Sequence, residues 1–210
     1  MKLVLHSAKR ASAPYRVRIG LNLKGLAFEL RPVDLVTNAH QSDTYRSLNA
    51  QALVPTLEVN GRPLTQSLAI LEWLDETVPE PRLLPADPFD RATVRAMAEI
   101  IACDIHPLNN LRVLRALTAL EIDEDQRNAW VARWISDGFS ALEPMVTQHG
   151  GAFAFGDEPS LVDCLLVPQV FNAGRFNVDL SPFPAIQAAA ARAALHPAIA
   201  AAHPDHHPER

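Results

Sequence analysis

Two segments place hydroxyl side chains where a helix is expected to begin. Gln66 and Ser67 stand between a predicted hairpin and a predicted helix, and Ser12 stands just before Pro14, which suits a first helical turn. Free backbone N–H groups and the helix dipole after Gln66 favour binding of a carboxylate. Serines in such places are also typical of ordinary N-caps. The residues alone therefore leave an anion-binding role and a capping role open.

Metal and redox chemistry have less support. The histidines grouped towards the C-terminus are His196, His203, His206 and His207. Since three of them lie among Pro, Asp and Glu at the very end and no cysteine accompanies them, we expect a solvated tail and no metal site. Cys103 and Cys164 form no Cys-x-x-Cys pair, so we expect two buried thiols in a reducing cytoplasm and no disulfide exchange by the protein's own sulfurs.

The clearest local structure is a β-hairpin. Residues 56–59 alternate in polarity, Asn60 and Gly61 form the favoured type I′ turn, and residues 62–65 return. Strands are also expected at residues 2–6 and 27–33, and helices at residues 14–24, 42–48 and 67–76. The order β-α-β-α-β-β-α predicts a thioredoxin-like sheet, whose first two strands are joined by a helical crossover.

The remainder of the chain is predicted to be helical. Ser160 and Asp163 form a capping box ahead of an apolar run, and four prolines between residues 79 and 88 indicate a connecting segment. Long helices are expected at residues 90–120, 124–149 and 185–202. We therefore expect an α/β domain at residues 1–82 and an all-helical domain at 89–210, with 79–88 as the linker.

Composition limits the possible partners. Lys plus Arg number 19 and Asp plus Glu 24, so the net charge of −5 argues against nucleic-acid binding. No apolar run approaches the roughly 18 residues needed to cross a membrane, and the N-terminal apolar run is too short for a signal peptide. We therefore expect a cytoplasmic protein without a membrane partner.

The ordered set of motifs resembles the zeta class of cytosolic glutathione transferases, which includes maleylacetoacetate and maleylpyruvate isomerases. The general motifs are YRVRI (residues 15–19), LVPTL (53–57), QSLAI (66–70) and RLLP (82–85). The more class-specific motifs are CDIHPLNN (103–110), GDEPSLVD (156–163), VPQV (167–170) and RFNVDL (175–180). The resemblance covers essentially the whole chain. It implies a thioredoxin-like N-terminal domain, an all-helical C-terminal glutathione-transferase domain, glutathione as cofactor and a homodimer.

The resemblance also assigns candidate glutathione-binding residues. Val54 and Pro55 resemble the family's cis-proline turn, in which the residue before proline binds the glutathione backbone. His40 would pair with the glycyl carboxylate, with an exposed loop histidine as the open alternative. The candidates for glutathione binding are Ser12, His40, Gln51, Val54, Pro55, Gln66, Ser67 and Asn110.

The thiol-activating position departs from the family pattern. The zeta class carries a Ser-Ser-Cys-like run after an arginine, whereas here Arg10 is followed by Ala11, Ser12 and Ala13, so the hydroxyl is displaced by one residue. Three outcomes stay open. In the first, Ser12 activates the glutathione thiol after a local backbone change. In the second, Arg10 and the helix N-terminus suffice to lower the pKa of the thiol. In the third, catalysis is weak or lost.

A maleyl substrate is a conjugated enedione with carboxylates at its ends. Thiolate addition to its cis double bond permits rotation, and expulsion of the thiolate then gives the trans isomer. Arg10 and Arg175 match family positions that hold the carboxylates, with surface ion pairs as the alternative. His106 matches the maleylpyruvate branch but Leu111 matches the maleylacetoacetate branch, so the substrate stays open.

We therefore expect a glutathione-dependent cis–trans isomerase of maleyl dicarboxylates in aromatic-compound breakdown. Its expected catalytic residues are Ser12, Arg10, His106 and Arg175. One alternative is a general glutathione transferase or α-halo-acid dehalogenase. Another is a non-catalytic glutathione-binding protein, for which the alanine at position 11 is the argument.

Overall fold

The computed structural model describes residues 1–207, which divide into two compact units. The first unit comprises residues 1–83 together with the chain from Leu195 onward, and the second comprises residues 84–194. The segment after residue 194 therefore groups with the N-terminal part, which differs from the expected helical domain at 89–210. Two hydrogen bonds tie this segment to α1: Arg18 Nε donates to Ala202 O and Asn22 Nδ2 donates to Ala198 O, each over 3.0 Å.

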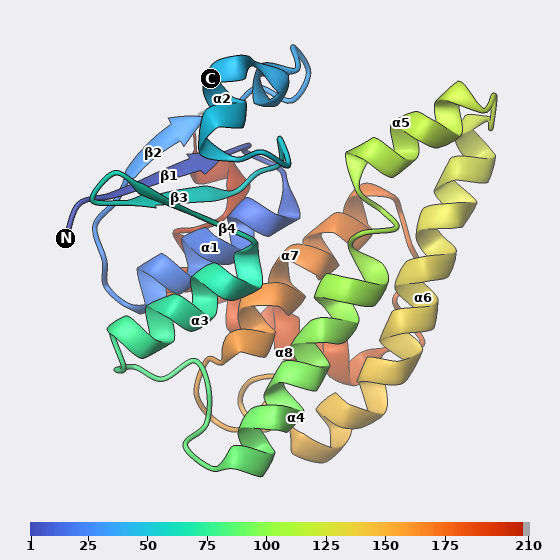
Figure 1. Cartoon of the computed structure of the whole chain (residues 1–210). Helices are drawn as coiled ribbons and strands as arrows, with labels where there is room; N and C mark the ends of the chain where they lie inside the picture. Colours follow the sequence, from blue (N-terminus) through green and yellow to red (C-terminus); the bar gives the residue numbers. More distant parts are fainter. Residues whose placement is uncertain (208–210) are drawn as a thin grey trace. The chain divides into compact units, whose positions relative to one another are not determined.

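The first unit contains a mixed β-sheet of strand order β2-β1-β3-β4, in which β1 pairs parallel with β2 and antiparallel with β3. The strands are β1 (Leu3–Ser7), β2 (Glu29–Pro32), β3 (Thr56–Val59) and β4 (Arg62–Thr65). Figure 1 shows α1 and α3 on one side of this sheet and α2 on the other. The helices are α1 (Ser12–Leu23), η1 (Ala39–Gln41, a 3-10 turn), α2 (Asp43–Leu48) and α3 (Ser67–Thr77). The thioredoxin-like prediction is confirmed.

Local chemistry explains these elements. Leu3, Val4 and Leu5 are buried in β1, one of the two strands that have neighbours on both sides. The β3–β4 turn places Asn60 at φ 50° and Gly61 at φ 81°, as a type I′ turn requires, so the hairpin prediction is confirmed. A Cβ at Gly20 of α1 would clash with the Leu71 side chain of α3, which is why glycine permits their close packing.

The second unit is helical. Its helices are α4 (Pro88–Glu99), η2 (Ile100–Ile105, a π-helix), α5 (Leu111–Ala119), α6 (Glu124–His149), α7 (Leu161–Arg175) and α8 (Pro184–Ala194). Figure 1 shows α4 continuing upward into η2, with the long α6 running beside them. Buried apolar side chains of α6 and α7, such as Phe139, Leu142 and Leu165, form much of the core.

The single helix expected at residues 90–120 is wrong. The chain passes from α4 into the π-helix, which ends at Ile105, and begins α5 only at Leu111. Asn110 caps that new start, because its Oδ1 accepts from Arg112 N over 3.1 Å. Trp130 Nε1 of α6 donates to Leu108 O over 2.9 Å and holds the break in place.

Two other helix predictions have different outcomes. Helix α6 spans the predicted residues, and the capping box of Ser160 and Asp163 is present at the start of α7. The helix expected at residues 185–202 is instead two helices, α8 and α9 (Pro197–Ala200), because Pro197 has no N–H for continuing α8 and begins a new helix.

The expectation of a solvated histidine tail holds only in part over the described residues, because His206 is exposed whereas His203 and His207 are half-buried. Residues Pro204–His206 form a 3-10 turn, η3, and the His203 ring lies edge-on to Tyr15 of α1 at 6.2 Å between centroids. Residues 208–210, which that prediction also covered, lie outside the described part of the chain. None of the helices in residues 1–207 is long and apolar enough to cross a membrane.

Candidate active site

The first part of the site is the loop between β1 and α1. Ala11 occupies the N-cap of α1 in extended geometry, and Ala11 N donates to Ala8 O over 3.2 Å. Ser12 is therefore the first helical residue and not the N-cap, so the capping alternative for Ser12 is wrong. Its side chain is buried, whereas Arg10 is exposed.

The start of α1 is suited to an anion such as a thiolate. The first N–H groups of a helix have no partner within it, and the helix dipole adds partial positive charge there. Pro14 contributes no N–H, so Ser12 and Ala13 supply these donors. Arg10 adds a full positive charge two residues before Ser12.

A second part is the turn before β3. The peptide bond between Val54 and Pro55 is cis, as the family resemblance predicted. The turn is held by Tyr45 OH and Asn49 Nδ2, which donate to Leu53 O over 2.8 Å and 2.7 Å. Both supporting side chains are buried, so α2 and the residue that follows it fix the backbone that presents Val54.

The third part is the start of α3. Gln66 is the N-cap at φ 69°, and Ser67 is the first helical residue and buried. Arg16 Nη1, from α1, donates to Ser67 Oγ over 3.2 Å. Because this bond occupies a lone pair of the serine oxygen, the hydroxyl hydrogen remains available to an incoming acceptor. The arginine, only 2% exposed, also brings positive charge behind the helix start.

The hairpin register brings two of these parts together. Thr56 pairs with Thr65, so the cis-proline turn just before β3 and the Gln66–Ser67 step just after β4 lie at the same end of the hairpin. Gln66 Nε2 also donates to Gln51 Oε1 over 2.7 Å. Val54, Pro55, Gln51, Gln66 and Ser67 therefore form one neighbourhood, as their joint assignment to one ligand requires.

His40 lies in η1, next to the start of α2. Its side chain is buried, so the alternative of an exposed loop histidine is wrong. Ser42 caps α2 by accepting from Tyr45 N over 3.2 Å, which ties this turn to the residue that supports Leu53. The pairing of His40 with a glycyl carboxylate stays a prediction.

The remaining candidates belong to the second unit. His106 follows the π-helix directly, and its backbone N donates to Ile101 O over 2.9 Å. Asn110 caps α5, so its Oδ1 already accepts a hydrogen bond from the backbone of that helix. Arg175 is the exposed last residue of α7, a helix that packs against η2. Their joint action with the residues of the first unit stays a prediction.

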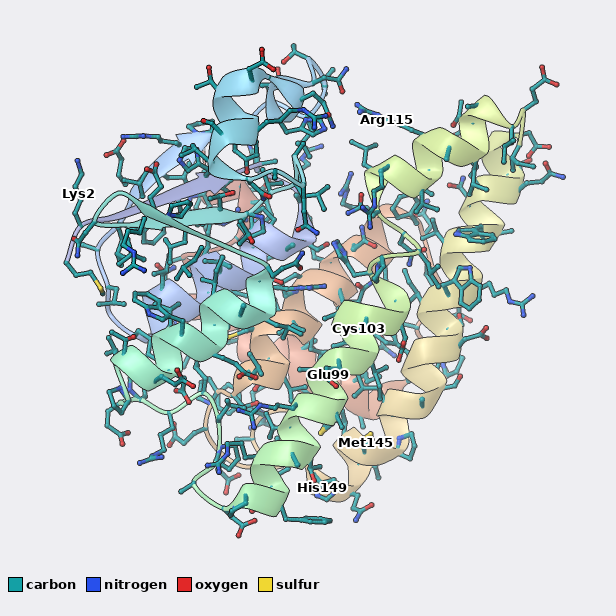
Figure 2. The ribbon with its side chains drawn as sticks, viewed as in Figure 1. Lys2, Glu99, Cys103, Arg115, Met145 and His149 are labelled. Atoms are coloured by element: carbon teal, nitrogen blue, oxygen red, sulfur yellow. The ribbon has the colours of Figure 1, made fainter. Side chains whose placement is uncertain are left out.

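The cysteines differ from each other. Both are present as thiols, but Cys164 is buried in α7 whereas Cys103 is exposed, so the prediction of two buried thiols is wrong for Cys103. Figure 2 shows Cys103 one turn beyond Glu99, on the helical stretch that continues α4. Among residues 1–207, no group of three or more His, Cys, Asp or Glu side chains is placed to hold a metal ion.

Sequence reasoning missed the supporting residues Arg16, Tyr45 and Asn49. Arg16 is, with Arg18, one of two charges within a largely apolar helical segment, and such a charge requires a buried partner if the helix is covered on all sides. Tyr45 and Asn49 gave no comparable signal, because their partner is a backbone carbonyl.

The chain is similar to known proteins over almost its full length. Residues 12–77 match the glutathione S-transferase N-terminal domain family. A maleylpyruvate isomerase from Ralstonia sp. is 47% identical over 208 residues, covering 96% of this chain and 98% of that protein. The solved holo structure of a bacterial zeta-class maleylpyruvate isomerase superposes with a TM-score of 0.96 at 45% identity, over 98% of this chain and 99% of that one.

A second solved structure carries the cofactor. Maleylacetoacetate isomerase from Anaeromyxobacter dehalogenans, crystallised with glutathione in its active site, superposes with a TM-score of 0.90 at 43% identity, over 99% of this chain and 97% of that one. Such identity over the full length establishes common descent as well as a common fold. The chain belongs to the zeta-class glutathione transferases, the family of the maleylacetoacetate and maleylpyruvate isomerases.

Proposed function

We propose that this protein is a glutathione-dependent cis–trans isomerase of maleyl-type dicarboxylates in aromatic-compound breakdown. The observation that carries the proposal is its full-length similarity to maleylpyruvate and maleylacetoacetate isomerases. Glutathione carries a carboxylate at each end. The residues of the first unit fit it because they combine a helix N-terminus, serine hydroxyls and a buried arginine.

Each part of glutathione has a candidate partner. Ser67, supported by Arg16, and Gln66 would hold the γ-glutamyl carboxylate. Val54 would bind the peptide backbone of glutathione, and His40 would face its glycyl carboxylate. Gln51 contributes through its hydrogen bond to Gln66, which orients both side-chain amides.

Bound glutathione supplies a thiolate that adds reversibly to the cis double bond of the substrate and so permits rotation. The protein favours the ionised thiol through the N–H groups at the start of α1, the charge of Arg10 and the hydroxyl of Ser12. The displaced hydroxyl makes Arg10 and the helix start the larger contributors.

The substrate carboxylates require cations. We assign them to Arg10 and Arg175, whose planar guanidinium groups match carboxylate geometry. His106 would donate to the substrate oxygen on which negative charge develops, and Asn110 is a further candidate for ligand binding. Both substrate types occur among the similar proteins, so we extend the proposal to either maleyl compound.

The test is isomerisation of maleylpyruvate and of maleylacetoacetate by the purified chain, each with and without glutathione. Conversion of at least one substrate only in the presence of glutathione supports the proposal. Tight glutathione binding without turnover of either substrate overturns it and favours a glutathione-binding protein. Release of halide from an α-halo acid, with no isomerisation, would favour the dehalogenase alternative.

Two accompanying properties are also proposed. The first is a homodimer, which light scattering of the purified protein would detect as twice the 23.0 kDa chain mass. The second is a cytoplasmic location, where the reducing environment keeps cysteines as thiols; both cysteines of this chain are thiols.

A further inference from the structure

Arg18 of α1 connects three separate segments of the first unit. Its Nη1 donates to Ser7 Oγ at the end of β1 over 3.0 Å, and its Nη2 donates to Lys9 O in the following loop over 3.1 Å. Its Nε donates to Ala202 O, a residue 184 positions later in the chain, over 3.0 Å. One fully buried side chain therefore joins β1, the β1–α1 loop and the C-terminal segment.

This arrangement is costly to alter. Burial lowers the pKa of Arg18 to about 10, which still leaves the guanidinium charged at neutral pH. A buried cation is tolerated only when its donors are satisfied, and here the acceptors are provided by all three segments. The ring of Tyr15 adds a face for the cation at 5.0 Å from its centroid.

The C-terminal segment has a second anchor on the same helix. Asn22 Nδ2 donates to Ala198 O, one turn beyond Arg18 along α1. Asn22 is matched to Arg18 in binding a carbonyl of this segment, but its hydrogen bond involves neither Ser7 nor Lys9. Substitution of Asn22 therefore affects only the attachment of the segment, whereas substitution of Arg18 also affects the position of the loop.

We propose that Arg18 is a positioning residue for catalysis: through Ser7 Oγ and Lys9 O it holds the β1–α1 loop in its working conformation, and Ala202 O is the third acceptor that orients its guanidinium group. The inference rests on the proposed function. Lys9, whose carbonyl Arg18 fixes, directly precedes Arg10, and Ala11 and Ser12 follow. This loop therefore determines where the charge of Arg10 and the first N–H groups of α1 lie.

The expected effect is on the thiol site, since a displacement of about 1 Å can cost roughly a hundredfold in rate. Arg18→Met removes all three donors, Arg18→Lys keeps the charge with a different geometry, and Asn22→Ala is the matched control that loosens only the segment. For each protein we would measure the ultraviolet titration of the bound glutathione thiol, kcat and KM for isomerisation, and the melting temperature.

Arg18→Met is expected to raise the pKa of bound glutathione by roughly one unit and to lower kcat by tenfold or more. Arg18→Lys should recover part of both losses, and Asn22→Ala should lower the melting temperature while leaving the thiol pKa unchanged. If Arg18→Met does not fold, the comparison of Arg18→Lys with Asn22→Ala decides.

Equal thiol pKa values and kcat in the Arg18 variants and in Asn22→Ala would overturn the inference, because Arg18 would then be only structural. The proposed function fails differently. Wild-type protein that neither binds glutathione nor isomerises a maleyl substrate overturns the function, and the inference with it. If the wild-type protein is active and the Arg18 variants keep its thiol pKa and kcat, only the inference is overturned.

Discussion

The alanine at the N-cap of α1 makes Ala11→Ser the most informative single substitution. Position 11 has extended geometry, φ −76° and ψ 131°, which a capping serine also adopts. A capping hydroxyl normally accepts from the N2 or N3 N–H, but N3 is Pro14, so only Ala13 N is available. The free energy of unfolding should therefore rise by only about 0.5 kcal/mol, the low end for a cap.

For a chain of this size, that gain corresponds to a melting temperature higher by roughly 1–2 °C. The larger effect is expected on the thiol, because the new hydroxyl can still donate its hydrogen after accepting from Ala13 N. One added hydrogen bond to a thiolate, at about 1.4 kcal/mol, lowers the pKa of bound glutathione by about one unit.

The assay combines thermal melting, ultraviolet titration of bound glutathione and isomerisation kinetics. Ser12→Ala and the double variant Ala11→Ser/Ser12→Ala are the controls. We expect Ser12→Ala to lower kcat/KM modestly and the double variant to exceed the wild type. If Ala11→Ser changes neither the melting temperature nor the thiol pKa, while Ser12→Ala abolishes activity, the reasoning is refuted and Ser12 is the activating hydroxyl.

Three further variants test other contacts. Lys24→Met removes a buried Nζ that binds Asp75 Oδ1 over 2.7 Å and should lower the free energy of unfolding by about 3 kcal/mol in urea; no change would contradict a buried ion pair. Asp163→Asn removes one of the carboxylate oxygens that accept from Ala154 N and from Ser160, so the free energy of unfolding should fall by about 2 kcal/mol. An unchanged melting temperature would contradict this prediction. Burial, with the charge of Arg18, lowers the pKa of His207 to about 4, so the native state binds fewer protons than the unfolded state and stability should fall as pH drops from 6.5 towards 4. His207→Gln should flatten that fall, and an identical pH dependence in both proteins would argue against it.

Much of the fold was predictable because its signals are local. The hairpin follows from two residues that tolerate positive φ, and the start of α7 follows from a reciprocal pair of polar side chains. The break after α4 was missed because Ile100–Ile105 keep helical spacing of apolar residues while changing to π geometry. The C-terminal segment was missed because Arg18 and Ala202 are distant in sequence.

The candidate site was predictable only in part. The motifs identified Gln66 and Ser67 and the cis bond before Pro55, which the hairpin register then brings to one end of the sheet. The buried donor behind Ser67 was not predicted, since a helical wheel shows that Arg16 lies in the helix but not which hydroxyl it meets. Partners of this kind depend on the packing of α1 against α3, which no local pattern encodes.

The central claim is that glutathione supplies the working sulfur and is regenerated in each cycle. The direct measurement is the number of maleylpyruvate or maleylacetoacetate molecules isomerised per glutathione, with free thiol assayed throughout, using the Cys103→Ala/Cys164→Ala variant so that no protein thiol contributes. We predict many turnovers per glutathione, an unchanged thiol concentration and no conversion without glutathione. Loss of one thiol for each substrate consumed would indicate a transferase, and conversion without glutathione would contradict the claim.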